Sequence, residues 1–167
     1  HPDTLVTMHN MASGLSKLGR HEESLAMYEK VLPLRSRVLG DDDPQTLNTM
    51  HGKARRLSDL RRHEDSLSLF QKVLVSRSRV LGEDHEDTLN TMKWVVNELR
   101  WLNRDEEAQP IASRGLILAT KAGKEHRVAA LAQRLSFIEE RLEKKAEGSA
   151  SSLTVEQRRL RDKLRLR

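Results

Sequence analysis

The chain repeats itself with a period of 42 residues. Stretches with the sequences HPDTLVTMHN, DPQTLNTMHG and HEDTLNTMKW begin at residues 1, 43 and 85. The first two units agree at 25 of 42 aligned positions, and the third keeps Thr-Leu-Asn-Thr-Met before it diverges. Such a period is typical of a solenoid, in which each unit buries its apolar face by stacking on its neighbours.

Each unit is predicted to form two helices. In the second unit, Asp43 is a good N-cap with a proline in the first turn, and apolar residues recur at helical spacing up to Leu57. Residues 61–63 are expected to form a turn. The second helix is expected from Glu64 to Gly82, which would end it as a C-cap in the left-handed conformation.

A further amphipathic helix is expected after Gly123, because apolar residues recur from Val128 to Leu142. Leu131 follows Leu89 by 42 residues, so this helix is in register with the first helix of a fourth unit. The predicted organisation is a solenoid over residues 1–146 (repeats 1–42, 43–84 and 85–124, capping helix 125–146), a linker over 147–152 and a basic amphipathic tail over 153–167.

Motifs at the ends of the units carry a resemblance to a known family. His-Pro-Asp-Thr-Leu opens the first unit at residues 1–5, and Arg-Val-Leu-Gly-x-Asp closes two units at residues 37–42 and 79–84. The units resemble the long tetratricopeptide repeats of the kinesin-light-chain and nephrocystin type. The family's packing positions fall on Ala12, Ala54 and Val96, on Ser24, Ser66 and Ala108, and on Tyr28, Phe70 and Ala112. Ala112 departs from the family's aromatic residue, so the third unit is expected to pack differently.

The resemblance implies both a fold class and a general function. The fold would be an all-α, right-handed superhelical solenoid of antiparallel helix pairs, with about three repeats plus a capping helix. First helices would line its concave face. The function would be that of a non-catalytic protein–protein interaction scaffold, which binds a peptide or partner domain in the concave groove.

Polar residues of the first helices form the candidate peptide-binding site. The candidate residues are His9, Ser13, Asn48, His51, Arg55, Asn90, Lys93, Trp94 and Asn97. Lys93 and Asn97 are four residues apart and share one helix face, and they look like part of the carboxylate clamp of some tetratricopeptide domains. Arg55 could add a bidentate donor. We therefore expect a short extended peptide with acidic residues or a C-terminal carboxylate; the alternative is a solvated polar face without a ligand.

Trp94 and Trp101 lie seven residues apart on one predicted helix. An indole ring in the groove could hold an apolar anchor of a peptide. Alternatively, both rings fill the space left by the small residues Ala112 and Gly115. The second explanation is favoured for Trp101, and both stay open for Trp94.

The sequence offers little support for catalysis or metal binding. The chain has no cysteine, which excludes disulfides, thiolate metal sites and cysteine nucleophiles. His21-Glu22, His63-Glu64 and His85-Glu86 lack the second histidine, four residues on, that a zinc protease needs. Phosphate-binding and nucleophile motifs are missing too. We expect no enzyme activity, no cofactor and no metal. No apolar run is long enough to span a bilayer, and we expect a cytoplasmic location.

The net charge of +5 is concentrated at one end of the chain. Residues 153–167 hold six basic and two acidic residues, so the other 152 residues are close to neutral. This tail could fold back on the last helix, continue a helix, be disordered, or bind a nucleic acid or an anionic membrane. Nucleic acid is the less favoured partner, because only 3% of the residues are aromatic.

Two further hypotheses concern assembly. The first residue is His1 rather than Met, which suggests either a segment of a longer protein or a processed chain. The repeats could then be a regulatory or autoinhibitory region of a larger signalling or motor-adaptor protein. The first helix has no preceding unit to cover it, so the edge near Leu5, Met8 and Leu15 could pair with another chain.

Overall fold

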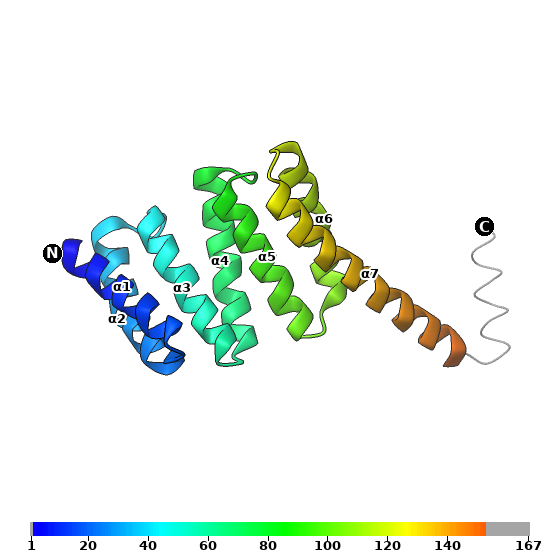
Figure 1. The fold of residues 1–167 in the computed structure, drawn as a ribbon, viewed down its shortest axis with the longest axis horizontal. Coiled ribbons are helices and arrows are strands. Elements are labelled where there is room, and N and C mark those ends of the chain that lie inside the picture. Colours follow the sequence, from blue (N-terminus) through cyan, green and yellow to red (C-terminus); the bar gives the residue numbers. More distant parts are fainter. Residues whose placement is uncertain (1, 153–167) are drawn as a thin grey trace.

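The structure, a computed structural model, describes residues 2–152, which form seven α-helices and no strand. The helices are α1 (Pro2–Lys17), α2 (His21–Leu39), α3 (Pro44–Asp59), α4 (His63–Leu81), α5 (Glu86–Trp101), α6 (Asp105–Lys121) and α7 (Glu125–Ser152). Each helix packs on the next one along the chain, and the pairs stack into an elongated array (Figure 1). The chain is an all-α repeat solenoid, as predicted.

Local sequence explains where the helices begin and end. Asp43 is the N-cap of α3, and its Oδ1 accepts hydrogen bonds from the amides of Gln45 at 2.8 Å and Thr46 at 3.3 Å. Gly40 and Gly82 end α2 and α4 with φ of 91° and 96°. Their ψ angles of 160° and 156° lie far from the left-handed helical region, so the expected left-handed C-cap at Gly82 is wrong. This region of φ and ψ is accessible essentially to glycine alone, which explains why both units have a glycine at the end of the second helix.

The linker expected over residues 147–152 is wrong, because α7 runs without a break through Ser152. Gly148 costs a helix interior only about 1 kcal/mol, and extending a helix that has already formed is far easier than starting one. The last part of α7 continues past the end of α6 (Figure 1). The hypotheses on the tail over 153–167 lie outside the described residues.

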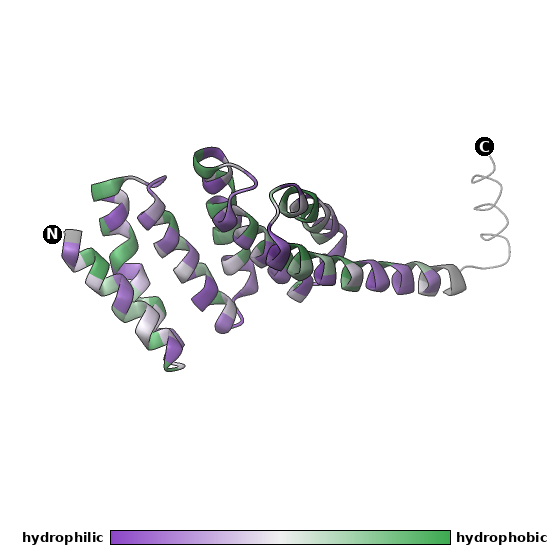
Figure 2. Ribbon diagram, turned by 45° about the horizontal axis from the view of Figure 1, so that its top comes forward, coloured by the Kyte–Doolittle hydropathy of each residue, from purple (hydrophilic) through white to green (hydrophobic). Residues whose placement is uncertain are grey.

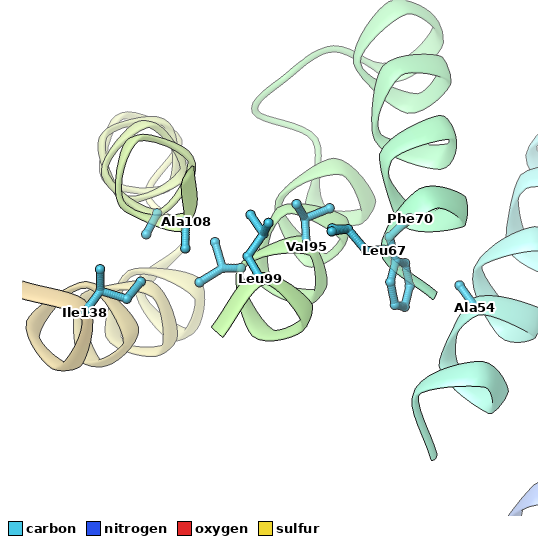
Figure 3. Packing of buried hydrophobic residues seen from close by; sticks show 9 residues of the cluster. Ala54, Leu67, Phe70, Val95, Leu99, Ala108 and Ile138 are labelled. Carbon is cyan, nitrogen blue, oxygen red and sulfur yellow. The ribbon is translucent and has the colours of Figure 1, made fainter. Parts of the chain in front are cut away.

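The core is continuous from the second unit to α7. Hydrophobic and hydrophilic residues alternate along the helices (Figure 2), as expected of helices that bury one face. Side chains of five helices meet in one cluster (Figure 3), whose labelled members are Ala54, Leu67, Phe70, Val95, Leu99, Ala108 and Ile138. The third unit does pack differently, since Ala112 is fully buried where the first two units bury Tyr28 and Phe70.

Buried arginines join the first units, and sequence reasoning missed them. Arg77 donates hydrogen bonds to the carbonyl oxygen of Asp87 at 3.1 Å and to Thr91 Oγ1 at 2.9 Å. Arg35 makes the equivalent bonds to Gln45 and Thr49 one unit earlier. Each arginine lies on a second helix and binds the start of the next first helix. The pattern therefore fixes the angle between consecutive units with charge-assisted hydrogen bonds.

The first helices α1, α3, α5 and α7 lie side by side and form what we call the first-helix face (Figure 1). α1 contacts α3, and α5 contacts α7. Within residues 2–152, no helix is long and apolar enough to cross a membrane.

Candidate functional site

The N-terminal part of the first-helix face is uncharged and partly buried. His9 Nδ1 and Thr49 Oγ1 lie 3.2 Å apart and share a hydrogen bond, and burial lowers the pKa of His9. Ser13 is half-buried on the same helix. His51 is 8% exposed, and its ring packs edge-on against Phe70 with centroids 5.0 Å apart. His51 therefore supports the surface from below and presents little of its ring to a ligand.

Three candidate asparagines accept hydrogen bonds from arginines. Arg77 donates to Asn48 Oδ1, Arg127 to Asn90 Oδ1 at 3.2 Å, and Arg134 to Asn97 Oδ1 at 2.7 Å. Two of these donors come from α7. The asparagines therefore hold arginine side chains in place, and the amide Nδ2 of an asparagine whose oxygen is engaged can still donate a hydrogen bond.

Trp94 forms a half-buried aromatic platform between α3 and α5. Its ring is stacked on Phe70 with centroids 5.6 Å apart and an angle of 16° between the ring planes. Arg55 and Lys93 lie over the indole, at 5.0 and 5.4 Å from the ring centroid. Cations held over an aromatic face are kept in a defined position while their charge stays available to an anion.

A row of like charges crosses the face from α3 to α7. The pKa of Lys93 is lowered by burial and by the positive charges of Arg127, Arg134 and Arg55. Burial, and then the charge of Arg100, lowers the pKa of Arg134. These mutual effects show that the cations lie close enough to repel one another. A bound anion would relieve that repulsion.

Most of this positive charge forms no ion pair, although Glu86 and Asp105 lie near enough to act on Lys93 and Arg100. Arg55, Lys93, Arg100 and Arg134 form no ion pair with any carboxylate in residues 2–152. Arg127 is different, because it binds Glu86. We call the four unpaired residues the cation row. Several cations elsewhere, such as Arg62 with Asp65 and Arg104 with Glu107, pair with acids three residues along their own helix.

The structure also corrects the explanation given for Trp101. This indole is 63% exposed and is stacked on His63, with centroids 5.5 Å apart and ring planes 12° apart. The space beside Gly115 is filled by Leu131 and the sulfur of Met92, which would lie 3.2 and 3.4 Å from an added Cβ. Trp101 therefore fills no gap in the third unit. It stands on the surface.

Sequence reasoning missed the contribution of α7, which was treated as a cap. Arg127 and Arg134 lie 37 residues from the asparagines that they contact. The repeat pattern could not predict Arg134, because the equivalent position one unit earlier holds Met92. As for metals, no group of three or more histidine or acidic side chains suitable for an ion occurs in the stretch that the structure describes.

Comparison with known proteins agrees with this geometry. Helix pairs stacked in sequence order define the class of all-α repeat solenoids. The tetratricopeptide repeat family matches residues 3–74. A structure of kinesin light chain nearly identical TPR-like repeats from Podosopora anserina matches with a TM-score of 0.68 at 19% identity, covering 95% of this chain and 82% of that one. BtubC (BKLC) from P. vanneervenii matches with a TM-score of 0.66 at 15% identity, covering 86% and 66%.

A search of curated proteins gave no match. The family match covers residues 3–74, less than half of the chain, and the fold of the described residues is similar to that of kinesin-light-chain TPR-like repeats. Repeats of this family serve in protein–protein interaction.

Proposed function

We propose that the first-helix face binds a short extended peptide that carries acidic residues or a C-terminal carboxylate. The observation that carries the proposal is the cation row, whose four charges lack a carboxylate partner within residues 2–152. Trp94 adds an aromatic surface over which two of these cations lie. A rigid ring with flanking cations offers contact area and charge at little cost in side-chain entropy.

The expected ligand follows from the spacing of these groups. They lie on three different helices of the first-helix face, so one compact anion would meet only some of them. An extended peptide with acids at several positions can contact charges on α3, α5 and α7 together. Each charge-assisted hydrogen bond contributes roughly 1.5–3 kcal/mol.

Fluorescence anisotropy with a labelled acidic peptide pool tests the proposal. Arg55→Glu combined with Lys93→Glu is expected to weaken binding by more than about tenfold at low salt. The matched control is Lys30→Glu with Arg37→Glu, which reverses two exposed charges on α2. The control changes the net charge equally and is expected to shift the affinity by about twofold at most. Equal losses in both variants would rule out a site on the first-helix face.

A further inference from the structure

A separate pocket lies at one end of the first-helix face, between α5 and α7. It has a volume of about 240 Å³ and is lined by Asn97, Arg100, Trp101, Phe137 and Arg141. Arg100, Phe137 and Arg141 were not singled out from the sequence, and Trp101 was expected to fill space rather than to bind a ligand. The pocket combines two exposed aromatic rings with two guanidinium groups, a composition unlike that of the surrounding helices.

The two arginines of the pocket differ in their partners. Arg141 is engaged, since its Nε lies 3.1 Å from Asp105 Oδ2 and its Nη2 donates to Asn103 Oδ1 at 2.7 Å. Arg100 is stacked on Phe137, with its Cζ 4.1 Å from the ring centroid. The buried Nε of Arg100 has no hydrogen-bond partner. Stacking fixes the plane of this guanidinium and leaves its Nη groups to bind a ligand. Burial lowers the pKa of Arg100, the charge of Asp105 acts in the opposite direction, and the charge of Arg141 lowers it further.

The neighbours of Arg100 favour a doubly charged ligand. Arg134 is close enough for the charge of Arg100 to lower its pKa, and it too lacks a carboxylate partner among the described residues. Arg134 does not line the pocket, but its Nε donates to Oδ1 of Asn97, which does, so both guanidinium groups stand beside the same small volume. A phosphoryl group carries about −1.5 to −2 charges at neutral pH and offers three acceptor oxygens, so it matches two arginines better than a single carboxylate does.

The aromatic rings of the pocket indicate what kind of molecule would bear the phosphoryl group. Trp101 and Phe137 are 63% and 43% exposed and stand at the pocket. Exposed aromatic residues beside unpaired cations are typical of surfaces that a partner covers. They offer contact to the apolar stem or ring of a side chain, while the arginines bind its charged end.

We propose that this pocket receives a phosphorylated side chain of the partner peptide. The inference rests on the proposed function, because the side chain arrives on a peptide bound to the first-helix face. Arg100 and Arg134 bind the phosphoryl oxygens, the amide of Asn97 donates to them, and Trp101 contacts the rest of the side chain. Phosphorylation of the partner would then strengthen the complex.

Five labelled acidic peptides that differ at one central position test this inference on the full chain. The position holds serine, phosphoserine, tyrosine, phosphotyrosine or glutamate. Each phosphorylated peptide is expected to bind about tenfold tighter than its unphosphorylated form and tighter than the glutamate peptide. In Arg100→Gln that ratio is expected to fall to about one, while the control Arg37→Gln keeps it.

The possible results separate the two proposals. Equal affinity for phosphorylated and unphosphorylated peptides would overturn the pocket, while the loss in the Arg55 and Lys93 charge reversal still supports the peptide face. A phosphate preference that survives in both Arg100→Gln and Arg134→Gln would also overturn it. If no peptide binds, both proposals fail. Circular dichroism verifies that each variant keeps its helices, and Arg134→Gln serves if Arg100→Gln does not fold.

Discussion

The ring of Tyr28 occupies the space where a side chain on Gly52 would stand. A Cβ added to Gly52 would lie 2.7 Å from Tyr28 Cζ and 2.8 Å from its hydroxyl oxygen. One unit later, the equivalent positions hold Phe70 and Trp94, whose rings are stacked. Equivalent junctions between units are thus packed in two ways. At the first, the Tyr28 ring packs against a glycine, and at the second, the Phe70 ring packs against the Trp94 ring.

Gly52→Ala is therefore expected to destabilise the protein by roughly 1–3 kcal/mol, because the buried Tyr28 ring must shift in a packed core. Urea denaturation measures the change. Gly14→Ala is the matched control, since Gly14 also lies within a helix but has no atom within 4 Å of an added Cβ. That control is expected to stabilise by about 0.5–1 kcal/mol, because alanine favours the helix. Destabilisation by both variants alike would contradict the packing explanation.

The buried arginine at the next junction leads to a second prediction. Arg77→Met is expected to lower the free energy of unfolding by roughly 2–4 kcal/mol, because it removes charge-assisted hydrogen bonds to Asp87 and Thr91. Arg79→Met is the control on the same helix, since Arg79 forms an exposed ion pair with Asp42. Its loss is expected to cost about 1 kcal/mol or less. Similar costs for the two, measured by chemical denaturation, would mean that Arg77 does not tie the units together.

A third prediction concerns the pH dependence of stability. Burial, followed by the charges of Arg77, Arg55 and Lys93, lowers the pKa of His51 from 6.5 to about 3. Below pH 6.5 the unfolded chain gains a proton on His51 that the folded protein binds only near pH 3. Lowering the pH therefore favours unfolding, and this residue alone is expected to remove about 2 kcal/mol between pH 7 and pH 5.

The measurement compares urea midpoints of the wild-type protein and His51→Leu at both pH values. The variant is expected to lose about 2 kcal/mol less than the wild type on acidification, whatever its stability at pH 7. Parallel losses would show that His51 titrates normally in the folded protein.

The fully buried carboxylate of Glu98 gives a fourth prediction. Ser58 Oγ donates to Glu98 Oε1 at 2.6 Å, and His63 Nδ1 lies 2.9 Å from Oε2. Glu98→Ala leaves both partners without their acceptor and opens a cavity, so a loss of about 3 kcal/mol or more in unfolding free energy is expected. Glu107→Ala, which removes an exposed partner of Arg104, is expected to cost about 1 kcal/mol at most. Thermal unfolding of the two variants decides the matter.

The sequence predicted the helices and their stacking well, because these depend on local signals and on the period. Asp43, the glycine-ended second helices and the recurring apolar positions each act within a few residues. Residues 147–152 were misjudged because glycine and serine are common in linkers, yet a long helix tolerates a few of them. The ψ angle of 156° at Gly82 could not be predicted, because a glycine at this position is compatible with several backbone conformations.

The candidate site was predicted less completely than the fold. Lys93, Arg55 and Trp94 do lie together, because a helical face and a fixed period bring them together. Arg77 was overlooked because arginine is usually exposed. Arg134 and the pocket at Phe137 depend on how α7 lies across α5, a contact between distant residues that no local pattern encodes.

The uneven distribution of charge along the first-helix face has a consequence for how a ligand lies on it. His9 and Ser13 on α1 are uncharged, whereas α5 and α7 carry Lys93, Arg100 and Arg134 without acidic partners among residues 2–152. An elongated molecule with acids at one end therefore has a lower energy in one orientation than in its reverse. The positive charge is concentrated towards one end of the array, and this uneven distribution would set the N-to-C direction of a bound peptide.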